Sequence, residues 1–326
     1  MKRFCVESSK FMTSYEKARA RLQCVTAEES GQRLDNFLLR HTHGVPKTRI
    51  YRAIRKGEVR VNKGRTKADY RVVGGDEIRI PPLSQVLSQS ADKPSLAWER
   101  RIRESIVCET DDFLAINKPT GLAVHGGSGV RLGLIESLRR LFPDERYLEL
   151  VHRLDRDTSG LVLVAKNGRT LRELHQQLRD DRVDKRYWAL VAGKWPAYRR
   201  SVAAPLAKHH TGSGERIVKV DVGGKSAETM FRVLERFRSA TLIEAKPVTG
   251  RTHQIRVHAL HSGHPILGDT KYETELSRRS CVNAPIKRLF LHASAISFRL
   301  AKQSISLECP LSAELEAVLD FFRQQR

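Results

Sequence analysis

Cysteine is scarce in this chain of 326 residues, and its placement is irregular. The five cysteines are odd in number, lie far apart and include no C-x-x-C pair. This pattern excludes a disulfide framework and a cysteine-based zinc site, and it is typical of a reducing compartment. The positions concerned are Cys5, Cys24, Cys108, Cys281 and Cys309.

Long apolar runs are missing as well. No stretch approaches the roughly 18 apolar residues that a membrane-spanning helix needs, so no spanning segment is predicted. The first residues are basic and lack the apolar stretch of about 7–15 residues found in secretory signals. Glu7 and Glu16 argue against an organelle-targeting sequence. We therefore expect residues 1–24 to form an N-terminal extension of a cytoplasmic protein.

Acidic residues are too few to balance the basic ones. The chain has 59 Lys+Arg against 37 Asp+Glu, a net charge of +22. A surplus of this size favours polyanionic partners, because cations that bind phosphates release counterions. The alternative is a basic protein that merely stays soluble. The length suits two domains, or one large domain with an appendage.

The basic charge is densest in a compact segment near the N-terminus. "GQRLDNFLLRH" and "PKTRIYRAIRKG" predict two helices, and "EVRVN" and "DEIRI" alternate like half-buried strands. Between positions 47 and 71, ten Lys/Arg face two acids, a net of +8. A charge run on a helix is usually a solvated face, but this density favours a phosphate-binding surface. The expected contacts are Lys47, Arg49, Arg52, Arg55, Lys56, Arg60, Lys63 and Arg65.

This segment resembles the S4 RNA-binding domain in the order of its elements and in the motifs "GEVRVN" and "GDEI". The resemblance covers about fifty residues and implies binding of structured RNA through its backbone. We assign residues 25–83 to this domain. The Pro/Ser/Gln-rich residues 84–97 are expected to form a linker, and residues 98–326 a larger catalytic domain.

The larger region mixes strand and helix patterns, which predicts an α+β fold. "SIVCETDDFLAINKP" looks like two short strands around an acidic turn, and "KRYWALVAGKW" and "ATLIEAKPV" look like single strands. "NGRTLRELHQQLRDDRV" predicts an amphipathic helix. "TGRTHQIRVHALHSGHP" predicts a helix entered through a glycine turn.

The stretch "YLELVHRLDRDTSGLVLVAKN" places charged side chains between two apolar runs. The runs are short and β-like, so "DRDTSG" is predicted to be a loop between buried strands, a common location of catalytic residues. Asp155 lies between Arg153 and Arg156, which would keep its carboxylate ionised, as a nucleophile or general base requires. From the residues alone, a catalytic carboxylate and a buried ion pair are equally open. Asp157, Thr158, Ser159 and Gly160 are ordinary turn formers.

"HRLDRDTSGLVLVAK" (152–166) resembles the signature of the RluA-type pseudouridine synthases. Five further blocks occur in the order that this family shows, although Glu273 stands where much of the family has glycine. The resemblance extends from about residue 31 to the C-terminus, and the preceding S4-like segment points to the branch that acts on large-subunit (23S) ribosomal RNA. The blocks are "NKPTGLAVHGG", "KRYWALVAG", "PVTGRTHQIRVH", "GHPILGDTKY" and "LFLHA".

The resemblance implies a role for four residues in isomerising uridine to pseudouridine. Asp155 would be the catalytic carboxylate, whether it attacks the anomeric carbon or removes the neighbouring proton. Tyr187 would stack on the flipped base, and Arg153 would fill the space that the base leaves in the RNA. Arg251 would pair with Asp155 or with a nearby phosphate, and an arginine where a glycine turn enters a helix can independently reinforce anion binding. The role of Arg156 stays open.

The reaction changes no oxidation state and needs no energy input, so no cofactor is expected. His253, His258, His261 and His264 lie close together in the sequence but lack a metalloprotease spacing, so no metal is expected. We expect a monomer that requires no protein partner. Two alternatives are a non-catalytic RNA-binding or ribosome-assembly protein and an S4-bearing methyltransferase, although no convincing glycine-rich loop for S-adenosylmethionine is present.

Overall fold

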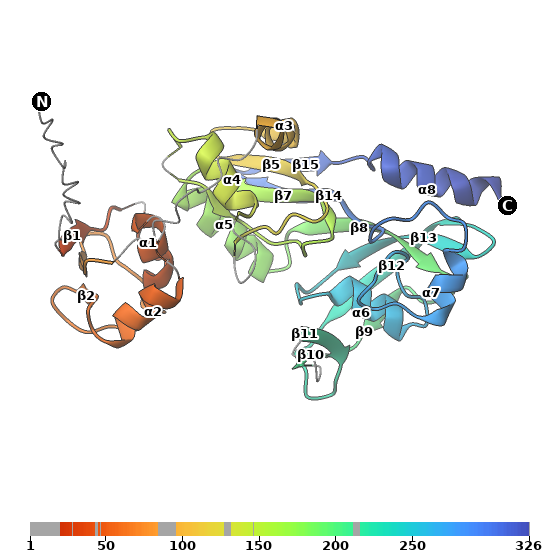
Figure 1. Cartoon of the computed structure of the whole chain (residues 1–326), viewed down its shortest axis with the longest axis horizontal. Coiled ribbons are helices and arrows are strands. Elements are labelled where there is room, and N and C mark those ends of the chain that lie inside the picture. The colour runs from red at the N-terminus through yellow and green to blue at the C-terminus, as the bar shows by residue number, and fades with distance from the viewer. Residues whose placement is uncertain are drawn as a thin grey trace, which may run out of the picture. The chain divides into compact units, whose positions relative to one another are not determined.

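The computed structural model of the chain describes residues 20–325, except residues 28, 43–44, 46, 84–95, 127–131, 146 and 211–215. The chain divides into two compact units, Met1–Lys93 and Pro94–Arg326 (Figure 1). Most of the predicted N-terminal extension and linker lies outside the described residues. None of the helices in the described part of the chain has both the length and the apolar character that crossing a bilayer requires.

The first unit packs two helices against a small antiparallel sheet. The apolar positions of the predicted helices, including Phe37 and Ile50, are buried in one core with Ile78 of the sheet. The sheet order is β1-β3-β2. The elements are β1 Arg21–Cys24, α1 Leu34–His41, α2 Lys47–Arg55, β2 Arg60–Val61 and β3 Glu77–Ile80.

The sequence interpretation missed β1. It placed residues 21–24 in the N-terminal extension, whereas the structure pairs Arg21–Cys24 antiparallel with β3. None of the four side chains is buried, and Leu22 is 66% exposed. An edge strand without a buried face shows no alternation of apolar and polar residues, so the pattern could not reveal it.

The second unit is built on one large mixed sheet, which is antiparallel except where β14 pairs with β7. Its order is β4-β5-β7-β14-β8-β13-β12-β9, with β15 paired to β14 and β6 paired to β7. The predicted α+β class is therefore confirmed. The strands are β4 Ile106–Glu109, β5 Phe113–Lys118, β6 Glu149–Leu150, β7 Ser159–Ala165, β8 Asp184–Ala192, β9 Ser201–Ala203, β12 Glu228–Arg236, β13 Ala240–Pro247, β14 Leu291–Leu300 and β15 Gln303–Glu308.

A separate hairpin, β10 Leu206–His210 and β11 Arg216–Val220, packs beside helix α6. In Figure 1, α3, α4 and α5 lie around the half of the sheet that contains β4, β5 and β7, while α6 and α7 lie with β12 and β13. α3 begins inside the segment predicted to be a linker. The helices are α3 Leu96–Glu104, α4 Leu134–Leu141, α5 Gly168–Arg179, α6 Gln254–His261, α7 Glu275–Ser280 and α8 Ala313–Gln324.

Strand β7 is buried along its whole length because both faces of the sheet are covered. Val162 and Val164 belong to one core cluster, whereas Leu161 and Leu163 belong to another. This explains why the sequence here is a continuous apolar run rather than an alternating one. The predicted loop is confirmed for residues 155–158, which lie between β6 and β7, whereas Ser159 and Gly160 already belong to β7 and β6 is only half-buried.

Gly160 fixes the start of β7 directly beside β14. Its φ is +105°, and an added Cβ would lie 2.3 Å from the carbonyl oxygen of Ala293. Gly160→Ala is therefore expected to lower the free energy of unfolding by about 2–5 kcal/mol, from backbone strain and overpacking together. Urea denaturation measures this loss. Gly121→Ala is the matched control, because Gly121 has φ +79° but no atom within 4 Å of an added Cβ; equal losses in the two variants would contradict the close-packing explanation.

Candidate active site

The sequence-predicted residues of the second unit meet at one cavity of about 310 Å³. Arg153 and Asp155 line it from the loop before β7, Tyr187 from β8, and Arg251 from the segment before α6. These segments are far apart in the sequence. The cavity therefore brings together all four residues that the motif resemblance selected.

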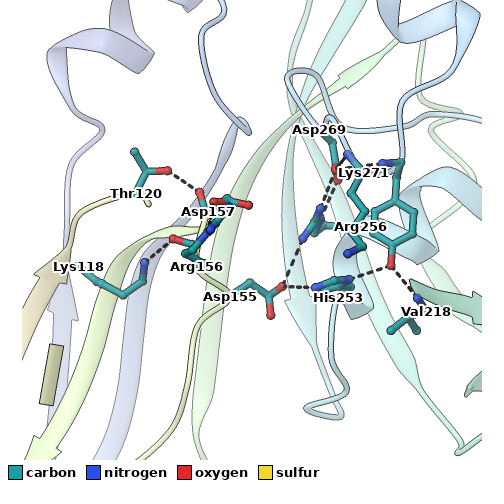
Figure 2. Close-up of polar contacts among 11 residues, drawn as sticks. Lys118, Thr120, Asp155, Arg156, Asp157, Val218, His253, Arg256, Asp269 and Lys271 are labelled. Atoms are coloured by element: carbon teal, nitrogen blue, oxygen red, sulfur yellow. Dashed lines mark hydrogen bonds and ion pairs between the residues drawn. The ribbon is translucent and has the colours of Figure 1, made fainter. Parts of the chain in front are cut away.

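The loop that carries Asp155 is held by groups from the last residue of β5 and from the segment that follows it. The buried Lys118 ammonium donates to the carbonyl oxygens of Pro119, Leu122 and Arg156 at 2.8–3.0 Å. Thr120 donates its hydroxyl hydrogen to the carbonyl oxygen of Asp157 at 2.8 Å (Figure 2). Two residues that flank Asp155 on its C-terminal side are thus fixed through their backbone.

Within this loop the side chains next to Asp155 have different surroundings. Arg156 is largely exposed and lies 3.2 Å from the carboxylate of Asp157. His152 accepts a hydrogen bond from the Leu163 backbone N–H at 3.2 Å. Burial, followed by the positive charge of Lys185, lowers the pKa of His152 to about 4, so its ring is neutral at neutral pH. Arg153 is exposed at the cavity wall.

The carboxylate of Asp155 faces two side chains from the region of α6. Its Oδ2 atom lies 3.9 Å from Nη1 of Arg256 and 4.0 Å from Nε2 of His253 (Figure 2). Both distances exceed a hydrogen bond, and only the contact with Arg256 is an ion pair irrespective of the protonation of a histidine. Asp155 therefore faces the guanidinium group of Arg256 and the imidazole ring of His253.

The prediction that Arg251 pairs with Asp155 is not met, since Arg256 occupies that place. Nε of the exposed Arg251 donates to the carbonyl oxygen of Ser226 at 3.0 Å. The cause is local: α6 begins only at Gln254, so Arg251 belongs to the preceding turn, whereas Arg256 lies on the buried side of the helix. The other predicted partner of Arg251, a phosphate, stays a prediction.

Arg256 is oriented by a buried carboxylate. Its Nε and Nη2 atoms each donate to one oxygen of Asp269 at 2.7 Å, which leaves Nη1 directed at Asp155 (Figure 2). Although burial alone would lower it, the hydrogen bonds and charge of Asp269 raise the pKa of Arg256 above its usual value. A two-point contact of this kind fixes the plane of the guanidinium group.

Tyr187 is buried on the cavity wall. Burial, followed by the negative charge of Asp155, raises the pKa of its phenol above the ordinary value. The hydroxyl group therefore keeps its proton at neutral pH, and the ring is a neutral flat surface beside the carboxylate.

Lys118 is expected to make the free energy of unfolding depend on pH. Burial, partly offset by the charges of Asp157 and Asp155, lowers its pKa from 10.5 to about 7. The folded protein then binds fewer protons than the unfolded chain between these pH values, so stability rises with pH across this interval. From pH 7 to 9, the wild-type free energy of unfolding should gain up to about 1.4 kcal/mol per pH unit relative to Lys118→Met. Denaturation at several pH values measures this difference.

The control for this titration is Lys194→Met, which removes an exposed lysine. It should follow the wild-type pH dependence. A difference between wild type and Lys118→Met that stays constant from pH 7 to 9 would contradict the assignment.

The basic residues predicted for RNA contact lie in the first unit. Arg52, Arg55 and Lys56 line one surface hollow. Lys63 and Arg65 are exposed. Within the unit, Arg49 pairs with Glu58 at 2.9 Å and Arg60 donates to the Gly57 carbonyl oxygen at 2.8 Å. The side chain of Lys47 lies outside the described residues.

The histidines that lie close together in the sequence contact different groups. His258 lies 2.9 Å from the Thr229 hydroxyl and 3.0 Å from the Ala204 carbonyl oxygen, and His264 lies 2.8 Å from the Ala192 carbonyl oxygen. Among the described residues, no group of three or more His, Cys, Asp or Glu side chains is arranged to hold a metal ion.

The two units match two families. Residues 112–261 match the model for RNA pseudouridylate synthase, and residues 32–78 match the model for the S4 domain. The chain is 50% identical over 299 residues to ribosomal large subunit pseudouridine synthase C of Yersinia pestis, with 90% of this chain and 93% of the relative covered. It is 48% identical over 316 residues to the protein of that name from Escherichia coli strain K12, with 95% and 99% covered.

Solved structures of pseudouridylate synthases are also similar to this chain. Human RNA pseudouridylate synthase domain containing 4 is 26% identical with a TM-score of 0.58, covering 70% of this chain and 96% of that one. Human RNA pseudouridylate synthase domain containing 1 is 28% identical with a TM-score of 0.54, covering 66% and 86%. Fold and relatives thus define an RNA-modifying enzyme with an S4 domain. The chain belongs to the RNA pseudouridine synthase family, as the motifs predicted.

Proposed function

We propose that this protein isomerises specific uridines to pseudouridine in large-subunit ribosomal RNA, with Asp155 as the catalytic carboxylate. The observation that carries the proposal is the meeting of Asp155, Tyr187 and Arg256 at one cavity, in a chain about half identical to relatives named for this activity. The reaction breaks the glycosidic carbon–nitrogen bond, turns the base and rejoins it through carbon 5. It needs no cofactor.

The chemistry begins with a uridine that leaves its stack, at a cost of a few kcal/mol. Asp155 then attacks the anomeric carbon or removes the neighbouring proton, and either role requires its ionised form. Arg256 faces the carboxylate from 3.9 Å. The neutral ring of Tyr187 stacks on the free base near the carbon 5 proton, which is lost as the product forms. Arg153, exposed at the cavity wall, fills the gap in the RNA.

The first unit holds the RNA through its phosphates. The exposed Arg52, Arg55 and Lys56 present three positive charges around one hollow, and Lys63 and Arg65 add two more. Such contacts position an RNA without reading its sequence. Target choice then depends on RNA shape and on which loops reach the cavity. The protein acts as a cytoplasmic monomer that requires no protein partner.

Incubating the full chain with large-subunit ribosomal RNA fragments tests this proposal. Pseudouridine should form in buffer without added cofactor, and S-adenosylmethionine should not change the yield. Formation of methylated nucleotides only when S-adenosylmethionine is added would instead favour a methyltransferase. RNA binding with no modified nucleotide under any condition would favour a non-catalytic RNA-binding protein.

A further inference from the structure

His253 lies at the junction between the cavity and the β10–β11 hairpin. It precedes α6 with φ +53°, a left-handed backbone conformation that is uncommon for residues other than glycine. Its side chain is 16% exposed and reaches the cavity wall. One ring nitrogen faces Asp155 (Figure 2), and the other lies 2.8 Å from the Tyr272 hydroxyl. A strained residue with both nitrogens engaged at a catalytic cavity suggests a role in the site.

The contact with Tyr272 favours one tautomer of His253. The Tyr272 oxygen accepts a hydrogen bond from the Val218 backbone N–H at 3.0 Å, and it lies 2.8 Å from Nδ1 of His253. In the described part of the chain, Nδ1 is the acceptor available to the Tyr272 hydroxyl hydrogen. Donation to Nδ1 requires that nitrogen to be unprotonated, so a neutral ring carries its hydrogen on Nε2.

In this tautomer the protonated nitrogen is the one that faces Asp155. Nε2 lies 4.0 Å from Oδ2, the same oxygen that Arg256 approaches to 3.9 Å. Burial lowers the pKa of His253 despite the opposing charge of Asp155, and the ring also faces the charges of Arg256, Lys271 and Asp269. The ring is therefore a neutral donor, and such contacts often shorten when substrate binds.

We propose that His253 is a positioning residue for Asp155, directing Nε2–H at Oδ2, while Tyr272 sets its tautomer and links it to β11 of the hairpin. This inference rests on the proposed role of Asp155 as the catalytic carboxylate. The chain of contacts runs from the Val218 N–H through the Tyr272 hydroxyl and the His253 ring to the carboxylate. His253 does not itself exchange a proton with the substrate; it restricts where the reacting oxygen lies.

His253→Asn and His253→Gln separate the two ring nitrogens. Asparagine tolerates the left-handed backbone, and its short amide reaches the Tyr272 side but not Asp155. Glutamine extends its amide N–H groups toward the place of Nε2. With a short ribosomal RNA fragment that contains a modified uridine, kcat should fall by roughly 10–100-fold in His253→Asn, because a misplaced reacting group costs about this much. His253→Gln should recover most of that loss, and KM should change by less than about 3-fold in both.

A second pair of variants tests the link to Tyr272. Tyr272→Phe removes the hydroxyl and should lower kcat by about 10-fold in the wild-type background but by less than about 2-fold in His253→Asn, since the contact it acts through is already lost. Tyr272→Phe also leaves the Val218 backbone N–H without its acceptor. This loss of stability is the same in both backgrounds, so it cancels when the two changes in kcat are compared. The control His261→Gln, an exposed histidine of the same helix, should keep wild-type kcat.

Wild-type kcat in His253→Asn, or equal losses from Tyr272→Phe in the two backgrounds, would overturn the inference while leaving the proposed function intact. If the proposed function itself were wrong, these assays would give a different result. In that case the wild-type protein would form no pseudouridine, or Asp155→Asn would remain active.

Discussion

Asp155→Asn is expected to abolish pseudouridine formation while RNA binding stays at the wild-type level. The amide has nearly the same size as the carboxylate, so the cavity and the loop contacts of Lys118 and Thr120 should be retained. An amide, however, can neither attack the anomeric carbon nor take a proton. A loss of on the order of 10⁴-fold or more in kcat is expected for a residue without which the chemical steps stop.

The measurement is release of tritium from carbon 5 of labelled uridine, with a binding assay on the same RNA. Asp157→Asn is the matched control, because Asp157 is an adjacent carboxylate whose side chain is 45% exposed and pairs with Arg156. It should change kcat by less than about 3-fold, as surface ion pairs contribute little. Turnover by Asp155→Asn within 100-fold of wild type would exclude Asp155 as the catalytic carboxylate.

Arg256→Met is expected to lower both the free energy of unfolding and kcat. The side chains of Arg256 and Asp269 are 5% and 1% exposed, so removing the cation leaves a buried carboxylate without its charged partner. Breaking a buried pair in this way costs about 3–5 kcal/mol in the free energy of unfolding. The loss of Nη1 beside Asp155 should also lower kcat by roughly 100-fold, since one charge-assisted contact in an active site is worth this much.

The double variant Arg256→Met/Asp269→Asn separates the two effects. The asparagine is neutral, and its oxygen can still accept from the backbone N–H groups of Lys271 and Tyr272. Denaturation should recover most of the lost stability, whereas kcat should stay low. Recovery of both quantities would mean that Arg256 acts only through folding.

Local pattern predicted most of the fold, because its strands and helices have clear buried faces. The two helices of the first unit, both strands around the acidic turn, and strands β8 and β13 all form where the apolar spacing placed them. Elements without a buried face were missed, as β1 was. The helix before Gly263 is also shorter than expected, because His253 is left-handed and α6 starts only after it.

The cavity residues were predicted less completely than the fold. The motifs selected Asp155 and Tyr187, but they selected Arg251 as the partner of Asp155, whereas Arg256, five positions later, lies beside it. What decides between them is the start of α6 and the pairing of Arg256 with Asp269, thirteen residues later. The available signal was that Arg256 stands between two apolar residues, Ile255 and Val257, which are both buried. A buried arginine needs a carboxylate partner, so this position could have been predicted to form an internal ion pair. The buried Lys118 was also missed: Pro119 and Leu122 are local acceptors, but the third carbonyl acceptor, that of Arg156, is brought to it only by tertiary structure.

The most direct test of the account is a pseudouridine map of large-subunit ribosomal RNA from cells with and without the gene. Specific sites should lose pseudouridine in the deletion strain, regain it when the wild-type gene is restored, and remain unmodified when Asp155→Asn is supplied at an equal level. An unchanged map in the deletion strain, or full restoration by Asp155→Asn, would contradict the central claim that this protein modifies that RNA through Asp155.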